Sequence, residues 1–264
     1  PGLSAERVLG VDASYNLRYG DFKARISGYY TRIYDQSKVI SYYDDVAATF
    51  TNFAMSGIDK VHFGLEAAVS IPIYHTLALN GAVSWGQYTY DSNPYYLQTQ
   101  DNSGDIVSDG YVYWKDFRVE STPQTAVNVG LSWRSNNNIY LSADFNYYNN
   151  MYLSMSPIYR TDAVITGGMA PGDIEHLRRQ EKFDSAYTLN ASIGKNWYIH
   201  RKYTLGFSLD VKNILNNQDI KTGGYEQTRL SKNTETTVTT YQAFDSKYFY
   251  MFGTTYYLNL YFRF

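Results

Sequence analysis

Histidines and carboxylates are the side chains of this 264-residue chain that could do chemistry, but their spacing predicts no reaction centre. His62 and Glu66 share one face of a predicted strand, where the extended chain separates them by about 13 Å. Two ligands of one metal ion do not lie that far apart. His75 and His200 fall in predicted turns and His176 in a long loop. We interpret all of them as solvated polar residues, and we predict neither a metal site nor a cofactor.

Sequence motifs for nucleotide binding and acyl transfer are absent. The chain contains no G-x-S-x-G, no G-x-G-x-x-G and no P-loop. Residues 101–105, Asp-Asn-Ser-Gly-Asp, resemble the start of a calcium-binding loop, but Val112 stands where the bidentate glutamate belongs. We therefore expect no catalytic residues, and the chain is predicted not to be an enzyme.

Aromatic residues gather in four segments that lack a strand pattern, and they are the candidate ligand contacts. A tyrosine offers a stacking face and a polar hydroxyl, so it could hold a ligand. The alternative is that these rings pack loop on loop or lie just above a membrane. Residues 91–121 are the first choice, because Asp101, Asp105 and Asp109 accompany their aromatics. The candidates are Tyr95, Tyr96, Tyr111, Tyr113, Trp114, Tyr42, Tyr43 and Tyr225.

Strands must position these segments, because apolar and polar residues alternate with a period of two along most of the chain. The last stretch, Thr254 to Phe264 (TTYYLNLYFRF), would reach about 35 Å as a strand, enough to cross a bilayer when tilted. No segment has a helical period. The predicted strands are 9–19, 22–38, 61–71, 77–90, 127–133, 139–147, 187–197, 203–211 and 254–264.

The connections between these strands alternate in length. Tight turns are predicted at 20–21, 74–76, 135–138 and 200–202. The other connections are long, and they cover about 39–60, 91–121, 153–184 and 215–247. Such long loops are uncommon in compact soluble domains, whereas this asymmetry is typical of outer-membrane barrels. The predicted fold is therefore all-β, a transmembrane antiparallel up-and-down barrel.

Composition excludes several other classes of protein. A formal net charge of -2 gives no electrostatic case for a nucleic-acid partner. The absence of cysteine excludes disulfides and thiolate zinc sites. No apolar run of 18 residues is present, and the mean hydropathy is -0.42, so a transmembrane helix is not expected. Residues 1–10 lack the basic start and apolar core of a signal peptide.

Charged residues on the polar side of the strands indicate a wide, wet barrel, because an unpaired charge in a dry core is very costly. An open sheet edge cannot lie in lipid, and nine strands break the even-number rule. We therefore expect these strands to belong to a larger barrel whose other strands precede Pro1. The residues expected to point into the lumen include Asp12, Lys23, Arg25, Glu66, Arg134, Asp144, Asp210, Lys212 and Arg263.

Three passages resemble the TonB-dependent outer-membrane receptors, in the version common in Bacteroidetes. They are Asn52 to Leu65 (NFAMSGIDKVHFGL), Leu209 to Leu215 (LDVKNIL) continuing as NNQDIKTGGYEQTRL, and the terminal YFRF. Receptors of this family have plugged barrels of about 22 strands. The resemblance implies that residues 1–264 form the nine C-terminal strands, with the plug domain, the TonB box and the earlier strands absent from this chain.

The resemblance also implies a function. Such a protein takes up a siderophore, haem, a vitamin, a glycan or a peptide across the outer membrane of a Gram-negative bacterium, with its C-terminus in the periplasm. The expected partners are the TonB-ExbB-ExbD energy-coupling complex through the missing plug, the barrel assembly machinery and outer-membrane lipids, and a surface lipoprotein is left open. The alternatives are a structural or adhesive barrel and an outer-membrane hydrolase. The expected assembly signal is Tyr256, Leu258, Leu260, Phe262 and Phe264.

Overall fold

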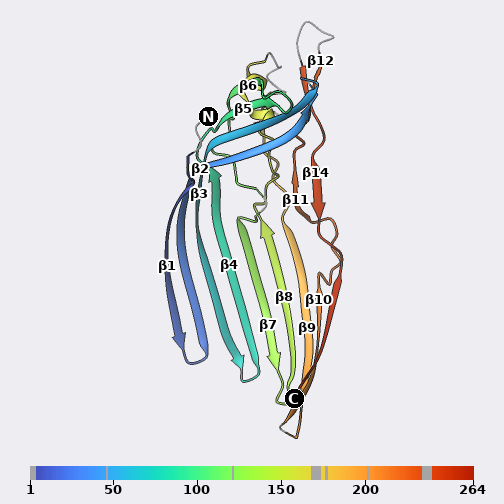
Figure 1. The fold of residues 1–264 in the computed structure, drawn as a ribbon. Coiled ribbons are helices and arrows are strands. Elements are labelled where there is room, and N and C mark those ends of the chain that lie inside the picture. Colours follow the sequence, from blue (N-terminus) through green and yellow to red (C-terminus); the bar gives the residue numbers. More distant parts are fainter. Residues whose placement is uncertain are drawn as a thin grey trace.

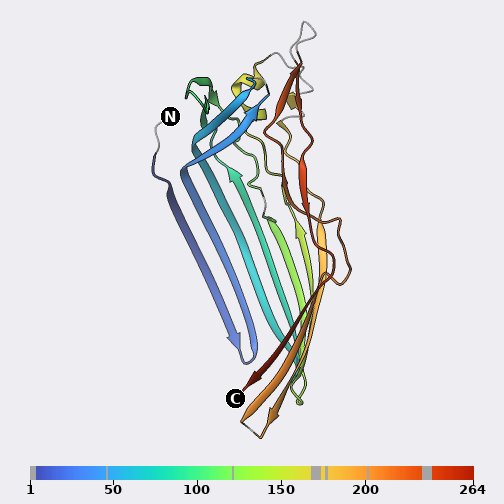
Figure 2. The same ribbon diagram turned by 45° about the vertical axis from the view of Figure 1, so that its right-hand side comes forward.

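One antiparallel sheet forms the main body of the protein (Figures 1 and 2). The computed structural model describes residues 4–45, 47–120, 122–167, 174–175, 178–200, 202–233 and 240–264. Nine strands follow one another through this sheet in chain order, which confirms the all-β meander. They are β1 (Arg7–Tyr19), β2 (Phe22–Asp44), β3 (Thr49–Tyr74), β4 (Leu77–Tyr90), β7 (Thr125–Arg134), β8 (Ile139–Asn149), β9 (Ala186–Ile199), β10 (Tyr203–Lys212) and β15 (Thr255–Arg263).

The register of the sheet keeps the apolar residues of all strands on one side. One row of paired residues crosses seven strands as Tyr15, Ile26, Ala67, Val83, Val127, Tyr147 and Tyr187. The neighbouring row consists of Asn16, Arg25, Ala68, Ala82, Asn128, Asn146 and Thr188. Successive residues of a strand point to opposite faces. The sheet therefore has one continuous apolar face and one polar face, as the alternation predicted.

The tight turns lie together at one end of the sheet, and the C-terminus lies at the same end (Figure 1). All four predicted turns are found, although residue 201 of the last one lies outside the described part of the chain. Gly20, Asn138 and His200 have positive φ values of 58°, 57° and 51°, as tight reversals of direction often require. At the two edges, β1 pairs only with β2 and β15 only with β10 among the described strands, so the sheet is open.

The first predicted loop, 39–60, is wrong, because β2 and β3 run through it as strands of 23 and 26 residues. Irregularities in the pairing occur between Ile33 and Lys38, and Asp35 and Gly57 have positive φ. Each bulge inserts an extra residue and shifts the phase of the alternation. Above the bulges the hairpin bends across the upper ends of its neighbours (Figure 1).

The other long connections also contain regular structure that the sequence did not predict. Strand β5 pairs with β3 and β6, while β11–β14 and β12–β13 form separate two-stranded sheets. The final strand is shorter than predicted, nine residues instead of eleven. The additional elements are β5 (Tyr95–Gln100), β6 (Ile106–Tyr111), the 3-10 helix η1 (Ile158–Arg160), α1 (Asp162–Ile165), β11 (Lys221–Tyr225), β12 (Leu230–Asn233), β13 (Thr240–Ala243) and β14 (Lys247–Tyr250).

These additions and the bent hairpin form a folded cap at the end of the sheet opposite the turns (Figure 2). We call residues 36–58, 88–124, 150–185 and 213–254 the cap. We call residues 7–35, 59–87, 125–149, 186–212 and 255–263 the wall. Within the described residues, the clusters of buried apolar side chains belong to the cap. No helix in this part of the chain has the length and apolar character needed to cross a membrane.

Candidate functional site

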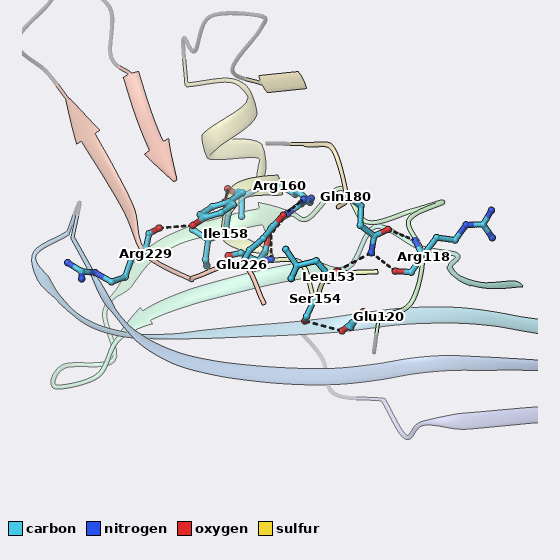
Figure 3. Close-up of polar contacts among 12 residues, drawn as sticks. Arg118, Glu120, Leu153, Ser154, Ile158, Arg160, Gln180, Glu226 and Arg229 are labelled. Carbon is cyan, nitrogen blue, oxygen red and sulfur yellow. Dashed lines mark hydrogen bonds and ion pairs between the residues drawn. The ribbon is translucent and has the colours of Figure 1, made fainter. Parts of the chain in front are cut away.

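A buried ion pair joins two connections of the cap (Figure 3). Arg160 is completely buried, and its Nη1 and Nη2 atoms donate to Oε2 and Oε1 of Glu226 at 2.5 and 2.9 Å. Nη1 also donates to the Ser156 carbonyl at 3.0 Å, and the Ser156 N–H donates to Glu226 Oε2 at 2.8 Å. A buried pair of charges is tolerated only when further hydrogen bonds satisfy it. The Arg160–Glu226 pair therefore fixes 150–185 against 213–254.

Hydrogen bonds between the Gln180 side chain and the main chain connect a third segment, 88–124, to the two segments that the ion pair joins (Figure 3). The amide of Gln180 accepts from the Arg118 N–H at 2.9 Å and donates to the Arg118 carbonyl at 2.7 Å. Tyr159 donates its hydroxyl hydrogen to the Arg229 carbonyl at 2.9 Å. The described parts of 88–124, 150–185 and 213–254 are therefore held together as one folded unit rather than as independent loops.

Three of the candidate aromatics lie inside this unit. Tyr42, Tyr96 and Trp114 are 8%, 1% and 2% exposed. Tyr96 stacks on Phe53 with ring centroids 4.6 Å apart, and Trp114 lies 4.7 Å from the Tyr90 ring. For these three residues the alternative interpretation, packing of loop on loop, describes their contacts. They offer almost no surface to a ligand, so we do not assign them as ligand contacts.

Three other candidates meet on the β5–β6 hairpin. Tyr95 and Tyr111 pair across the strands, with their rings edge to face at 5.5 Å. Tyr95 donates to Asp109, one of the acidic residues that had favoured this segment. Tyr113 donates to Asp162 Oδ1 at 2.5 Å, and the Tyr111 N–H donates to Asp162 Oδ2 at 2.7 Å. We call Tyr95, Tyr111 and Tyr113 with these two carboxylates the tyrosine platform.

Exposure separates the remaining candidates from the buried ones. Tyr111 is 52% exposed, and Tyr43 and Tyr225 are 41% and 45% exposed. Tyr43 lies near the tip of the β2–β3 hairpin and Tyr225 at the end of β11, so the structure does not place them on the tyrosine platform. The sequence missed Asp162, because it belongs to a different connection and only folding brings it to β6. The sequence offers one local indication of structure at Asp162, the preceding Thr161, whose side chain caps α1.

The tyrosines Tyr159, Tyr96 and Tyr113 of the cap have raised pKa values. Burial raises the pKa of Tyr159 to about 12, and burial also raises the pKa of Tyr96. The hydrogen bond to Asp162 raises the pKa of Tyr113. These groups therefore act as hydrogen-bond donors rather than as anions.

Two hollows open into the cap beside these residues. The larger, of about 530 Å³, lies between residues 179–182 and 243–248 and is bordered by Tyr159 and Glu226. The smaller, of about 220 Å³, is lined by Tyr42, Tyr96 and neighbours from η1 and α1. Ligand pockets of proteins commonly occupy 300 to 1,000 Å³. The larger hollow is thus of a size to hold a small polar ligand.

The histidines do not assemble into a site. His62 is half-buried on the polar face and lies 4.8 Å from the Tyr88 ring, while His75 and His200 lie at the tight turns. His176 lies outside the described residues. In the described ranges, no cluster of three or more histidine, aspartate or glutamate side chains is arranged to hold a metal ion. Asp105, from the calcium-like segment, instead accepts from Ser103 Oγ at 2.7 Å.

The expected assembly signal occupies one face of the last strand. Its members alternate along β15, and Leu258 and Phe262 pair with Leu209 and Leu205 of β10. Phe262 also stacks on Tyr203, with centroids 5.8 Å apart. The five residues Tyr256, Leu258, Leu260, Phe262 and Phe264 are 56 to 94% exposed.

No protein-family model matches the chain, and a search of curated proteins found no match. A functional proposal must therefore depend on the residues and geometry described above.

Proposed function

We propose that this chain is part of an outer-membrane β-barrel that takes up a nutrient by TonB-dependent transport. The observation that carries the proposal is the continuous apolar face of the wall, on which Leu65, Val129 and Leu258 are 55%, 45% and 60% exposed. A soluble sheet covers its apolar face with a second layer. The described residues supply no such layer, because their buried apolar clusters lie in the cap. Lipid would supply it.

The ends of the sheet suggest an orientation in the membrane. Short turns are typical of the periplasmic side of such barrels and long connections of the outer side. The cap would then lie outside the cell and the C-terminus in the periplasm. Aromatic side chains near the turns, such as Trp197 and Phe262, would lie at the interface between lipid and water.

Barrel closure requires more strands than those described. The outer edges of β1 and β15 have no partner among the described strands, and unpaired backbone groups are very costly in lipid. We infer that further strands join these edges, to a total of about 22 if the resemblance to TonB-dependent receptors holds. The charges of the polar face would then line a lumen filled by water and a plug domain.

The ligand would meet this part of the barrel at the tyrosine platform and at the larger hollow of the cap. The exposed ring of Tyr111 offers a stacking face, and Asp109 offers hydrogen-bond acceptors beside it. Energy for uptake would come through the plug from the TonB complex. The cargo would be one of the nutrients that the resemblance implies, and no covalent chemistry is needed.

Single-cysteine labelling tests the membrane placement, because the chain contains no cysteine. In intact cells that express the full-length protein, a membrane-impermeant maleimide should label Tyr111→Cys. It should label Asn137→Cys, in a tight turn, only after the outer membrane is permeabilised. Leu131→Cys on the apolar face should stay protected in both conditions. Labelling of Asn137→Cys in intact cells would show that the orientation is the opposite of the one proposed. Labelling of Leu131→Cys would show that the apolar face of the wall does not lie in lipid.

A growth assay tests transport separately from placement. Cells lacking the gene should lose growth on one of haem, a ferric siderophore, a vitamin, a glycan or a peptide digest supplied as sole source. Truncating one aromatic anchor commonly costs about 2 kcal/mol of binding, about 30-fold in affinity. Tyr95→Ala, Tyr111→Ala and Tyr113→Ala together should therefore impair that growth, while Tyr74→Ala at a tight turn should not. Normal growth of the deletion strain on every source would favour a structural or adhesive barrel.

A further inference from the structure

A hollow of about 500 Å³ interrupts the apolar face of the wall. It lies over β1, β2, β3, β4 and β7, within the wall. The hollow is open because small residues occupy its centre. Ala24 and Gly81 lie on either side of Val69 in one row of paired residues, and Ala67 lies between Ile26 and Val83 in the neighbouring row of the same face. Larger apolar side chains border it, namely Tyr15, Leu17, Ile26, Val83, Val127 and Val129.

The hollow offers a ligand no hydrogen bond. Arg25 and Asn128 also border it, but their side chains belong to the polar face, where they donate to Ser14 and Asn146. The strands β2, β3 and β4 are each paired on both sides, so their backbone groups are used within the sheet. A docked peptide segment would bring its own unpaired N–H and C=O groups to this surface at a high cost. A hydrocarbon chain has no such groups.

The size of the hollow also argues against a protein partner. A specific protein interface takes about 20 to 30 residues from each side. The hollow is bordered by about half that number, and its volume is instead in the range of small-ligand pockets. On β1 to β4 the bordering residues lie in the half nearest the tight turns, whereas Val127 and Val129 lie in the cap half of β7, so the hollow lies near the middle of the wall.

We propose that this hollow holds one acyl chain of a membrane phospholipid. The inference rests on the proposed function, which places the apolar face in lipid and the tight turns in the periplasm. A chain seated over Ala24, Ala67 and Gly81 contacts walls on two sides, whereas a chain on the flat apolar face contacts one. The extra dispersion contacts favour the seated chain over its neighbours in the bilayer.

Photo-crosslinking tests the proposal on the purified full-length protein in phospholipid vesicles. The probe is a phosphatidylethanolamine with a diazirine on one acyl chain, and crosslinked peptides are identified by mass spectrometry. Crosslinks should be enriched in residues 15–26 and 67–83 relative to the apolar face of β8 to β10. Ala67→Phe should fill the hollow and abolish the enrichment, and Ala24→Leu provides a smaller filling change should Ala67→Phe fail to fold.

A matched control is Ala143→Phe, which adds the same ring on the apolar face of β8, away from the hollow. It should leave the enrichment unchanged. Equal crosslinking along all wall strands of the unaltered protein would overturn the acyl-chain site but would leave the wall in lipid. Absence of crosslinks from every wall strand would overturn the membrane placement as well. Enrichment that survives both filling variants would also overturn the site.

Discussion

The cap and the wall handle apolar side chains in opposite ways. In the cap, Phe53 and Trp114 are 1% and 2% exposed, and they pack against the rings of Tyr96 and Tyr90. In the wall, Leu65 and Leu258 are 55% and 60% exposed although both lie in regular strands. The connections of this protein therefore contain its hydrophobic core, while the strands leave their apolar face to the surroundings. Such a division is the reverse of the usual arrangement in a soluble β domain, where loops lie on the surface.

Polar groups also differ between the two regions. The Arg160–Glu226 ion pair of the cap has a fully buried arginine and a glutamate side chain that is 12% exposed. The wall keeps most of its charges on the open polar face, and Arg7, Arg32 and Lys195 are charged residues at apolar-face positions near its ends. On the polar face of the wall, tyrosine rings pack over glycine residues of the neighbouring strand. Tyr140 lies opposite Gly194, and the Tyr140 ring occupies the space that a side chain at Gly194 would need. The two regions should therefore respond differently to the same kinds of substitution.

The largest expected effect is on the cap alone. Glu226→Ala would leave the Arg160 charge buried without its partner, which typically costs about 3 to 5 kcal/mol. Hydrogen exchange of the full-length protein should show lost protection in 150–185 and 213–254 and unchanged protection in the wall. The double variant Arg160→Met with Glu226→Leu should recover most of the protection, because it removes both charges. Unchanged protection in Glu226→Ala would mean that the pair does not hold the cap together.

A smaller effect should distinguish the two faces of the wall. Leu131→Arg on the apolar face should cost about 2 to 4 kcal/mol near the bilayer midplane, and Ser132→Arg on the polar face should cost much less. The fraction of folded, heat-modifiable protein in the outer membrane, followed against urea, measures both. Equal losses in the two variants would contradict the assignment of the apolar face to lipid.

Packing on the polar face should be sensitive to a single methyl group. In Gly194→Ala the new Cβ would clash with the Tyr140 ring, and overpacking of this kind commonly costs about 1 to 3 kcal/mol. Gly10→Ala is the matched control, because the nearest atom to its Cβ would be Thr31 Oγ1 at 3.8 Å. Urea unfolding of the barrel compares the two. Adding Tyr140→Ala to Gly194→Ala should relieve the clash with the ring and recover part of the stability, because the new Cβ would still lie 2.7 Å from the Phe207 carbonyl oxygen. No recovery at all would place the strain elsewhere.

The mildest perturbation is alkaline pH, which should weaken the cap before the wall. The pKa of Tyr159 is about 12 in the folded cap and 10.0 without burial, so the folded state retains the proton more strongly. Its contribution to stability is complete below pH 10 and is lost as the pH rises toward 12. Hydrogen exchange across this window should show the cap opening first, and less steeply in Tyr159→Phe. Simultaneous opening of cap and wall would contradict the prediction.

The tyrosine platform was predictable only in part. Tyr95, Tyr111, Tyr113 and Asp109 lie within 19 residues of one another in the sequence, and the pairing of β5 with β6 brings Tyr95 opposite Tyr111. Asp162 comes from 51 residues beyond Tyr111, so no local pattern could connect them. Burial was equally hidden from the sequence, because Tyr96 is next to Tyr95 and differs from it only in which face of the hairpin it occupies.

Alternation by itself determined the nine wall strands, the positions of the tight turns between them and the two faces of the sheet. It could do so because the face to which a side chain points depends only on whether its position along the strand is odd or even. The register then aligned these faces along the rows described above, in which Ala68 and Ala82 are the apolar members of the polar row. Tertiary structure alone decided the cap. Bulges between Ile33 and Lys38 reset the parity, and Arg160 meets Glu226 from 66 residues away. Such contacts depend on how the whole chain folds, and a local pattern of residue types does not contain them.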